Sequence, residues 1–345
     1  MTTTTARSAP AIETTTAAPL VEISGMSVTF SARAASGTGV RAVDDFGIRI
    51  VPGDRVAIVG ESGSGKTTAC MAIAGFLPYH DTTVGVRIAE FDGAPMELGS
   101  AGNRIPRRRP GVTMIFQDAM TSLDPVWRIG SQFKAAIRGA GTRGRAEQRD
   151  IAEHWLRRVG LPDTERVLRS RSYELSGGMR QRVMLALAMC SSPRLLIADE
   201  PTSALDASLA RDTMQLIRDL VDETGTALLM ISHDIELTQR FCDRMVVMYG
   251  GHIVEEGAAG QIRATPRHPY TAALFASVPT LAQLDDEQLP TIAPAPVPFP
   301  DISRQGCPFR FRCPRASADC EVMPGAATVP GTDTIVRCWH PLEAR

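Results

Sequence analysis

The chain of 345 residues is long enough for one large domain or two smaller ones with a sizeable buried core. Its formal net charge of −1 gives no indication of a nucleic-acid-binding surface or of an acidic substrate. No apolar run approaches the length needed to span a bilayer, and the Thr- and Ala-rich residues 1–19 lack the apolar core of a secretory signal, so they are expected to form a disordered tail.

Two strands are predicted before the first glycine-rich stretch. Residues 20–30 alternate between apolar and polar side chains, and a second strand pattern covers residues 46–51. The Ser-, Ala- and Gly-rich residues 31–39 separate the two patterns, and this composition is typical of a loop.

The stretch Gly-Glu-Ser-Gly-Ser-Gly-Lys-Thr-Thr lies between an apolar run, residues 55–59, and an apolar helical pattern, residues 70–77. A strand, a loop with the spacing Gly-x4-Gly-Lys-Thr and a helix predict a phosphate-binding P-loop, because backbone amides and the positive helix end converge on phosphate oxygens. We expect Lys66 to reach the β- and γ-phosphates of a nucleotide and the Thr67 hydroxyl to hold Mg²⁺. The expected nucleotide-binding residues of the loop are Gly60, Glu61, Ser62, Gly63, Ser64, Gly65, Lys66, Thr67 and Thr68.

Two features on either side of this loop have more than one explanation. Phe30 ends the first predicted strand and could stack on an adenine ring, but a position in the core is an equally open alternative. The basic run Arg107-Arg108-Arg109 could contact phosphate, although its short length favours a solvated loop.

From residue 112 onwards, short apolar runs alternate with helical patterns, and this predicts an α/β fold with a mainly parallel sheet. Polar residues come just after three of the strands: Gln117, the pair Asp199-Glu200, and His233, which Ser232 separates from its strand. The expected strands are 112–116, 195–198, 227–231 and 245–249, and the expected helices between and beside them are 180–190 and 207–224.

A charged, helical stretch from about residue 118 to 176 predicts a helical subdomain inserted into this fold. Within it, residues 146–159 place Trp155 and Leu156 on one apolar face and end at Gly160.

The main domain is expected to span residues 20–265, followed by a C-terminal extension over residues 266–345. The extension begins with a short helix within residues 266–279, and the Pro-rich residues 289–300 are typical of an extended linker. A cluster of cysteines follows: Cys307, Cys313, Cys320 and Cys338.

Five signals follow one another along the chain: the P-loop, Gln117, the segment Leu-Ser-Gly-Gly-Met, the strand that leads into Asp-Glu, and His233. In this order they resemble the ATP-binding subunits of ABC transporters, over about residues 20–260. The resemblance implies an ATPase with a P-loop ABC-type nucleotide-binding domain, in which a mainly parallel sheet is joined by an antiparallel β subdomain and a helical subdomain. It also implies ATP and Mg²⁺ as cofactors.

The resemblance further implies roles for individual residues. Asp199 and Gln117 are expected to contact Mg²⁺ together with Thr67, and His233 is expected to contact the γ-phosphate. Glu200 corresponds to the general base that polarises the attacking water. The expected catalytic residues are therefore Lys66, Gln117, Glu200 and His233.

The segment Ser176-Gly177-Gly178 implies a second subunit. In this family it binds the γ-phosphate of ATP held by the opposing nucleotide-binding domain, and the loop that ends at Asp206 aligns the two halves. Met179 replaces the glutamine commonest in the family but leaves these phosphate donors in place. Because the chain has a single P-loop, the second ATPase domain is expected on another polypeptide, in a heterodimer.

Three further segments narrow the resemblance to ATPases of the oligopeptide, dipeptide and nickel import group: residues 116–125, residues 176–182 and Arg267-His-Pro-Tyr-Thr271. This group implies a second ATPase, two transmembrane permeases and an extracytoplasmic substrate-binding protein, with this chain as a peripheral subunit on the cytoplasmic face of the membrane. Peptide import is the expected function. Import of nickel or a metal chelate is the alternative, and a soluble ABC-type ATPase of DNA repair or translation is a distant one.

The C-terminal cysteines have the spacing C-x5-C-x6-C-x17-C, without the close pairs typical of zinc ribbons. Four thiolates also suit an iron–sulfur cluster, and the resemblance implies a 4Fe-4S cluster here. Structural zinc, and unliganded or disulfide-linked cysteines, are the alternatives, and His340 keeps a mixed ligand set open. The remaining cysteines, Cys70, Cys190 and Cys242, lie in apolar helical patterns and are expected to be small buried side chains.

Overall fold

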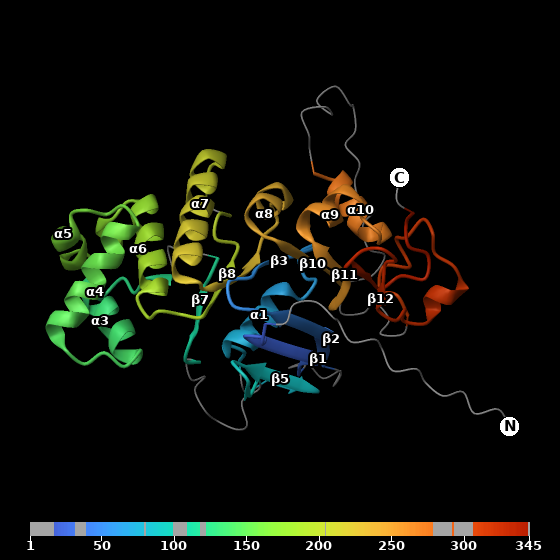
Figure 1. The fold of residues 1–345 in the computed structure, drawn as a ribbon, viewed down its shortest axis with the longest axis horizontal. Coiled ribbons are helices and arrows are strands. Elements are labelled where there is room, and N and C mark those ends of the chain that lie inside the picture. Colours follow the sequence, from blue (N-terminus) through green and yellow to red (C-terminus); the bar gives the residue numbers. More distant parts are fainter. Residues whose placement is uncertain are drawn as a thin grey trace.

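A computed structural model of the chain describes residues 17–31, 39–78, 81–98, 109–117, 122–203, 205–278, 292 and 306–343. The predicted tail up to residue 16, Arg107 and Arg108, and the Pro-rich linker apart from Ile292 lie outside the described residues. The described part is organised around an eight-stranded sheet (Figure 1).

This central sheet has the strand order β12-β13-β11-β10-β3-β9-β8-β7. The five strands from β10 to β7 run parallel, while β11, β13 and β12 pair antiparallel at one side. The strands are β3 (Arg55–Val59), β7 (Val112–Ile115), β8 (Leu195–Asp199), β9 (Ala227–Ile231), β10 (Arg244–Tyr249), β11 (His252–Ala258), β12 (Ala327–Thr328) and β13 (Ile335–Val336). The prediction of a mainly parallel sheet is therefore confirmed, and each strand predicted for this sheet is found within a residue of its expected bounds.

The parallel strands are apolar along their whole length because both faces of the sheet are covered. In β3, Val56 and Ile58 point to one side and Ala57 and Val59 to the other, and all four are completely buried. The helices on the second side are α6 (Gly177–Met189), α7 (Ala207–Thr224), α8 (Ile235–Phe241), α9 (Ala259–Ala264) and α10 (Pro269–Ala276). The first side is covered by α1 (Lys66–Ala74) and by a second sheet (Figure 1).

The second sheet is antiparallel, as expected for the β subdomain. Its strands are β1 (Val21–Phe30), β2 (Val40–Ile50), β4 (Thr82–Gly85), β5 (Ile88–Phe91) and β6 (Ala94–Pro95), in the order β2-β1-β5-β6 with β4 also on β1. Strands β4 and β5 both pair with β1, on either side of Gly25, whose φ of +65° breaks the regular extended backbone of β1.

The helical subdomain lies at the β7 end of the central sheet (Figure 1). It comprises α3 (Ile129–Gly139), α4 (Arg145–Arg158) and α5 (Thr164–Arg169), with α6 leading back to the sheet. The predicted helix 146–159 is thus confirmed as α4. In α3 the residues Ile129, Phe133 and Ile137 recur every four positions and are fully buried, which explains why this stretch is helical.

The segment 267–271 opens α10 through a set of local hydrogen bonds. His268 is the N-cap, and its Nδ1 accepts a hydrogen bond from the Tyr270 N–H at 3.0 Å. The buried Glu255 carboxylate accepts from the N–H groups of Arg267 and His268, at 2.7 and 2.9 Å. Burial raises the pKa of Glu255, and these donors oppose that rise. A carboxylate at a helix N-terminus also interacts favourably with the helix dipole.

Protonation of His268 is expected to destabilise the fold in acid. Burial lowers the pKa of His268 to about 3, while an imidazole in the unfolded chain titrates near ~6.5. The unfolded chain therefore takes up a proton first, so the free energy of unfolding falls as the pH decreases from ~6.5 towards 3, by up to about 1.4 kcal/mol per pH unit.

Urea unfolding at pH 7.5 and at pH 5.5 measures this loss. The variant His268→Gln, which keeps an acceptor for Tyr270, should lose less stability between the two pH values than the wild type. His154 is an exposed histidine on α4, and His154→Gln should keep the wild-type loss. An equal loss in His268→Gln and wild type would contradict the assignment.

Candidate nucleotide site

The parallel strands bring four distant segments to one edge of the sheet. Ile58 of β3 and Asp199 of β8 both pair with Ile231 of β9, and Ile115 of β7 pairs with Ala198 of β8. The residues that follow these strands are the P-loop, Glu200, His233 and Gln117. Because parallel strands end at the same edge, the sequence-predicted catalytic groups meet there.

The P-loop has a backbone that only glycine fits at two positions. A Cβ on Gly60 would lie 2.2 Å from the Met248 carbonyl oxygen, and a Cβ on Gly65 would lie 2.4 Å from that of Ala42. Gly65 has φ +98° and is the N-cap of α1. Among the described residues no side chain caps it, so the first amides of α1 are available to an anion.

Lys66 is folded back over this loop. Its side chain is buried, and Nζ donates to the carbonyl oxygens of Gly60 and Glu61, both at 2.8 Å, and to the Ser64 hydroxyl at 3.4 Å. Burial lowers the pKa of Lys66, and the carboxylates of Glu200 and Asp199 oppose this. A buried ammonium held by neutral oxygens is ready to exchange them for phosphate oxygens.

Two oxygen donors suited to Mg²⁺ lie beside the loop. The Thr67 hydroxyl and the Asp199 carboxylate are 3.4 Å apart, and Asp199 is buried at the end of β8. Burial is the largest influence on the pKa of Asp199 and raises it. The Thr67 hydroxyl opposes this rise, and the neighbouring Glu200 adds to it. Hard oxygen ligands of this kind are what Mg²⁺ takes when it also binds phosphates, so the donor set fits the metal.

Glu200 is held between Gln117 and His233. Gln117 Nε2 donates to Glu200 Oε2 at 2.6 Å, and His233 Nε2 contacts the other carboxylate oxygen. The backbone of Glu200 has φ +48°, which is unfavourable for a residue with a side chain, and its N–H donates to the Ile231 carbonyl at 2.9 Å. Such a backbone conformation costs about 1–2 kcal/mol and is often found at functional sites, where it holds a side chain in a required orientation.

Other predicted site residues lie elsewhere. Ser176 is exposed and caps α6, accepting a hydrogen bond from the Met179 N–H at 3.3 Å. Figure 1 shows α6 among the helices at one end of the sheet, apart from α1. Asp206 caps α7, accepting from the N–H groups of Ser208 and Leu209. Phe30 is partly buried and packs with the core between the two sheets. The structure thus collects Lys66, Thr67, Gln117, Asp199, Glu200 and His233, but leaves these residues outside the cluster.

Comparison with known sequences gives two family matches. The family described as "ABC transporter" matches residues 43–203, and the "Oligopeptide/dipeptide transporter, C-terminal region" matches residues 254–320. A probable peptide ABC transporter ATP-binding protein of Sinorhizobium fredii is 40% identical over 88% of this chain and 90% of its own length. The chain belongs to the ABC transporter ATP-binding proteins. A dipeptide transport ATP-binding protein of Escherichia coli strain K12 is 37% identical, over 94% of this ABC protein and 97% of the relative.

Solved structures agree on the fold of this ABC protein. An ATP-binding cassette in a dimeric post-hydrolysis state with bound ADP and Pi has a TM-score of 0.56 at 25% identity, covering 70% of this chain and 99% of its own. A subunit of an ABC transporter complex from Clostridium perfringens has the same TM-score at 23% identity, covering 71% and 90%. Within the described residues, the helices are all too short or too polar to cross a membrane.

The four C-terminal cysteines are free thiols in the structure. Burial raises the pKa of Cys307 to about 11, and the thiols of Cys320, Cys338 and Cys313 contribute to the rise. Nevertheless, no three His, Cys, Asp or Glu side chains in the described residues are grouped so that they could hold a metal ion. Thiol donors suit an iron–sulfur cluster or zinc, but the described residues give the predicted cluster no support.

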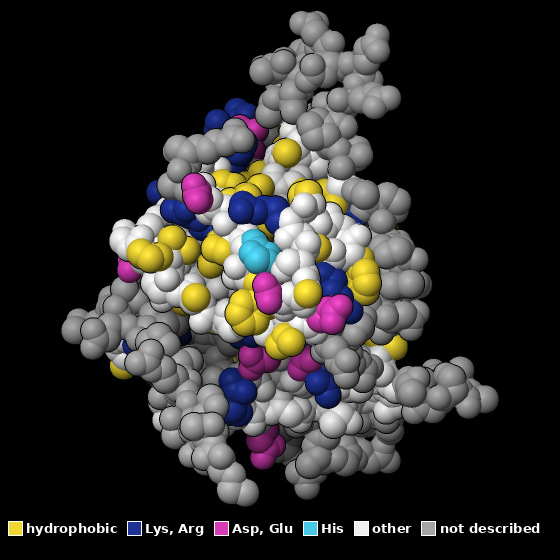
Figure 2. All heavy atoms as spheres, turned by 90° about the vertical axis from the view of Figure 1, so that its right-hand side faces the viewer, with side chains coloured by type: hydrophobic (Ala, Val, Ile, Leu, Met, Phe, Trp, Pro, Cys, Tyr) yellow, Lys and Arg dark blue, Asp and Glu magenta, His cyan; other side chains and the backbone are white. Residues whose placement is uncertain are grey.

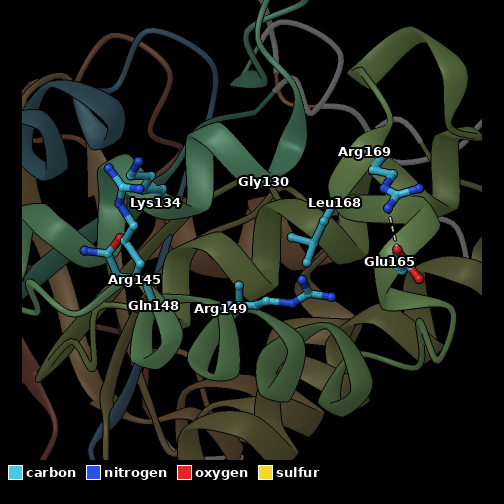
Figure 3. Close-up of a pocket in the computed structure, with 9 residues that line it drawn as sticks. Gly130, Lys134, Arg145, Gln148, Arg149, Glu165, Leu168 and Arg169 are labelled. Atoms are coloured by element: carbon cyan, nitrogen blue, oxygen red, sulfur yellow. Dashed lines mark ion pairs between the residues drawn. The ribbon is translucent and has the colours of Figure 1, made fainter.

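A cavity of about 270 Å³ lies in the helical subdomain, away from the P-loop. Figure 3 shows Lys134 and Arg145 on one side of it and Arg169 paired with Glu165 on the other. It contains none of the predicted site residues.

Sequence reasoning missed two residues that contact the P-loop from the C-terminal part of the chain. Tyr270 Oη accepts from the Glu61 N–H at 2.8 Å, and Arg312 binds the Glu61 carboxylate. No local pattern signals these contacts, because their partners are 209 and 251 positions apart in the sequence. Only the family segment 267–271 pointed to this region.

Proposed function

We propose that this protein is the ATP-hydrolysing subunit that drives peptide import through an ABC transporter. The observation that carries the proposal is the position of Glu200, held by Gln117 and His233 beside Asp199 and the P-loop. Hydrolysis of a γ-phosphate needs a placed water and neutralised charge rather than covalent chemistry, and this cluster can supply both. ATP hydrolysis is also what membership of the ABC transporter ATP-binding proteins entails.

Each residue of the cluster has a role in this proposal. Lys66 and the first amides of α1 bind the phosphates, and Thr67 and Asp199 hold Mg²⁺, which supplies positive charge when bound. Glu200 accepts a proton from the attacking water. Its present contacts with Gln117 and His233 must loosen so that the water can reach the carboxylate. Gln117 then contacts the metal and water, and His233 contacts the γ-phosphate.

The site is completed by a second ATPase subunit in this proposal. Ser176 and Gly177 lie exposed, and Gly178 partly buried, at the N-terminus of α6, apart from the P-loop of the same chain. An exposed helix N-terminus can bind a phosphate brought by another subunit. Asp206 aligns the two halves, and the partner is proposed to be a different chain.

Peptide is the proposed cargo because the match over residues 254–320 and the named relatives are those of peptide transporters. Nickel or a metal chelate is the second candidate cargo, and it rests only on the resemblance to the oligopeptide, dipeptide and nickel import group. Two permeases and an extracytoplasmic binding protein are the proposed partners, with this subunit at the cytoplasmic face of the membrane.

An exposed apolar patch on the helical subdomain suits a permease. It consists of Val126, Trp127 and Tyr173, which are 72%, 54% and 60% exposed. A bridge between Arg128 and Arg171 brings the two segments together, and Arg171 donates to the Val126 carbonyl. Exposed tryptophan and tyrosine are typical anchors of protein interfaces, so we propose that this patch contacts a cytoplasmic loop of a permease.

Replacing Glu200 tests the hydrolytic role. Glu200→Gln should lower the ATPase rate by about 10²–10⁴-fold, because a positioned general base is lost, while ATP binding survives. The rate is measured by phosphate release from the assembled transporter and binding by a fluorescent ATP analogue. Glu236→Gln, an exposed glutamate on α8, is the control and should retain the wild-type rate. Near-normal turnover of Glu200→Gln would remove Glu200 from this role.

Replacing Trp127 tests the docking patch. Trp127→Ala should weaken binding to the permease pair by at least about tenfold, since interface tryptophans commonly contribute this much. Nucleotide binding by the purified subunit should stay unchanged. Trp339 is an exposed tryptophan on the C-terminal extension, and Trp339→Ala provides the matched control. If both variants co-purify with the permeases as well as wild type, the patch is not the docking site.

The iron–sulfur cluster proposed for the four C-terminal cysteines needs chemical analysis. Anaerobically purified protein should contain about four iron and four sulfide per chain if these thiols hold the cluster, and zinc instead if the alternative is right. Replacing Cys313 by Ser should lower the iron content, whereas Cys242→Ser, a buried thiol elsewhere, should not. A folded wild-type protein free of iron and zinc would end both proposals.

A further inference from the structure

The C-terminal extension lies on the side of the molecule that faces the viewer in Figure 2, and in the described part of the chain it is hydrogen-bonded to the P-loop at Glu61. The guanidinium of Arg312 donates to both Glu61 carboxylate oxygens, at 2.8 and 3.0 Å, and also to the Tyr249 hydroxyl at 3.0 Å. Tyr270 accepts from the backbone N–H of the same glutamate. Its carbonyl oxygen accepts from Lys66. Every polar group of Glu61 is therefore bound, on one side by the loop lysine and on the other by the C-terminal part of the chain.

Buried aromatic rings fix the position of Arg312. Its N–H donates to the Phe309 carbonyl at 2.9 Å, and the Phe309 ring lies 5.2 Å from Tyr249 and 5.3 Å from Tyr270. These three rings are almost completely buried, and the Arg312 side chain is only 6% exposed. A bidentate pair held in this way is more rigid than a surface ion pair.

The charge of Glu61 explains why such a pair matters. A carboxylate at the second position of a phosphate-binding loop would repel the phosphates of ATP if it were unpaired and turned inward. Arg312 neutralises this carboxylate and turns it towards the extension. The loop amides and Lys66 then face the nucleotide without a competing anion.

We propose that Arg312 is a positioning residue of the ATPase: by binding Glu61 it keeps the P-loop in its nucleotide-binding form, so the C-terminal extension controls ATP affinity. This inference rests on the proposed ATPase function and adds a residue that lies outside the nucleotide-binding domain predicted from the sequence. Arg312 directly precedes Cys313, so a conformational change in the cysteine-rich segment would be transmitted to the P-loop through the ion pair of Arg312 with Glu61.

The test is ATP affinity in full-length variants, measured with Mg-ATP by calorimetry, together with the melting temperature. Arg312→Gln should raise the Kd for Mg-ATP by about tenfold, which corresponds to about 1.4 kcal/mol, because it leaves an unpaired carboxylate in the loop. At saturating ATP, kcat should change by less than about threefold, since the group that activates water is untouched. Arg315→Gln removes the same charge from an exposed position three residues away and should stay within about twofold of wild type.

The double variant Arg312→Gln/Glu61→Gln separates this role from simple packing. Removing the unpaired carboxylate should restore most of the affinity that Arg312→Gln loses, and this rescue supports the proposal. A lower melting temperature with unchanged Kd in Arg312→Gln, or an equally weak double variant, overturns it. If Arg312→Gln does not fold, Arg312→Lys, which keeps the charge but lacks the planar fork that donates to both carboxylate oxygens, should give an intermediate Kd, and a wild-type Kd overturns the proposal. If wild-type protein binds no ATP, the proposed function itself is wrong.

Discussion

The register of four parallel strands is the constraint on which the candidate site depends. Strands β3, β9, β8 and β7 are paired so that their carboxyl ends lie side by side. Each strand is buried on both faces, so a shift by one residue would move every side chain into the differently packed core on the other side of the sheet. The packing of the sheet therefore fixes the position of the P-loop, Glu200, His233 and Gln117 to within a residue. The polar side chains at the carboxyl ends of the strands are therefore positioned by the apolar packing of the sheet.

Much of this arrangement could be predicted from local sequence. Short runs rich in Val, Ile and Leu identified the parallel strands, and the P-loop spacing located the site, because both signals depend only on neighbouring residues. Once the strands were located, the polar residues that come after them, Gln117, Glu200 and His233, could be named as site residues. The strands β11, β12 and β13 were not predicted: β12 and β13 have two residues each, and they form because β13 pairs with β11 and β12 pairs with β13, which short-range patterns do not reveal. The contacts of Glu61 with Tyr270 and Arg312 are missing from the prediction for the same reason.

The electrostatics of the site are balanced rather than simply positive. Asp199 and Glu200 are adjacent carboxylates, and burial together with Glu200 raises the pKa of Asp199. The same two carboxylates oppose the loss of charge that burial imposes on Lys66. Lys66 in turn lowers the pKa of Asp199, so this cation and this acid favour each other's ionised state, against burial and against the charge of Glu200. Glu61 is the one acidic residue in the P-loop, and its carboxylate is paired with the guanidinium of Arg312 from the C-terminal extension.

This balance bears on why the chain places an ion pair between its core and its C-terminal extension. Replacing a buried pair with apolar residues is often neutral or stabilising, so Arg312 and Glu61 are not explained by stability alone. The aromatic contacts of Phe309, Tyr249 and Tyr270 can already hold the extension against the core without any charge. What the aromatic rings cannot do is orient a carboxylate in the loop. The aromatic packing would exist without the ion pair, but the ion pair also fixes the orientation of the Glu61 carboxylate. Glu61 is the residue whose carbonyl oxygen accepts from Lys66, so this orientation is fixed within the phosphate-binding loop.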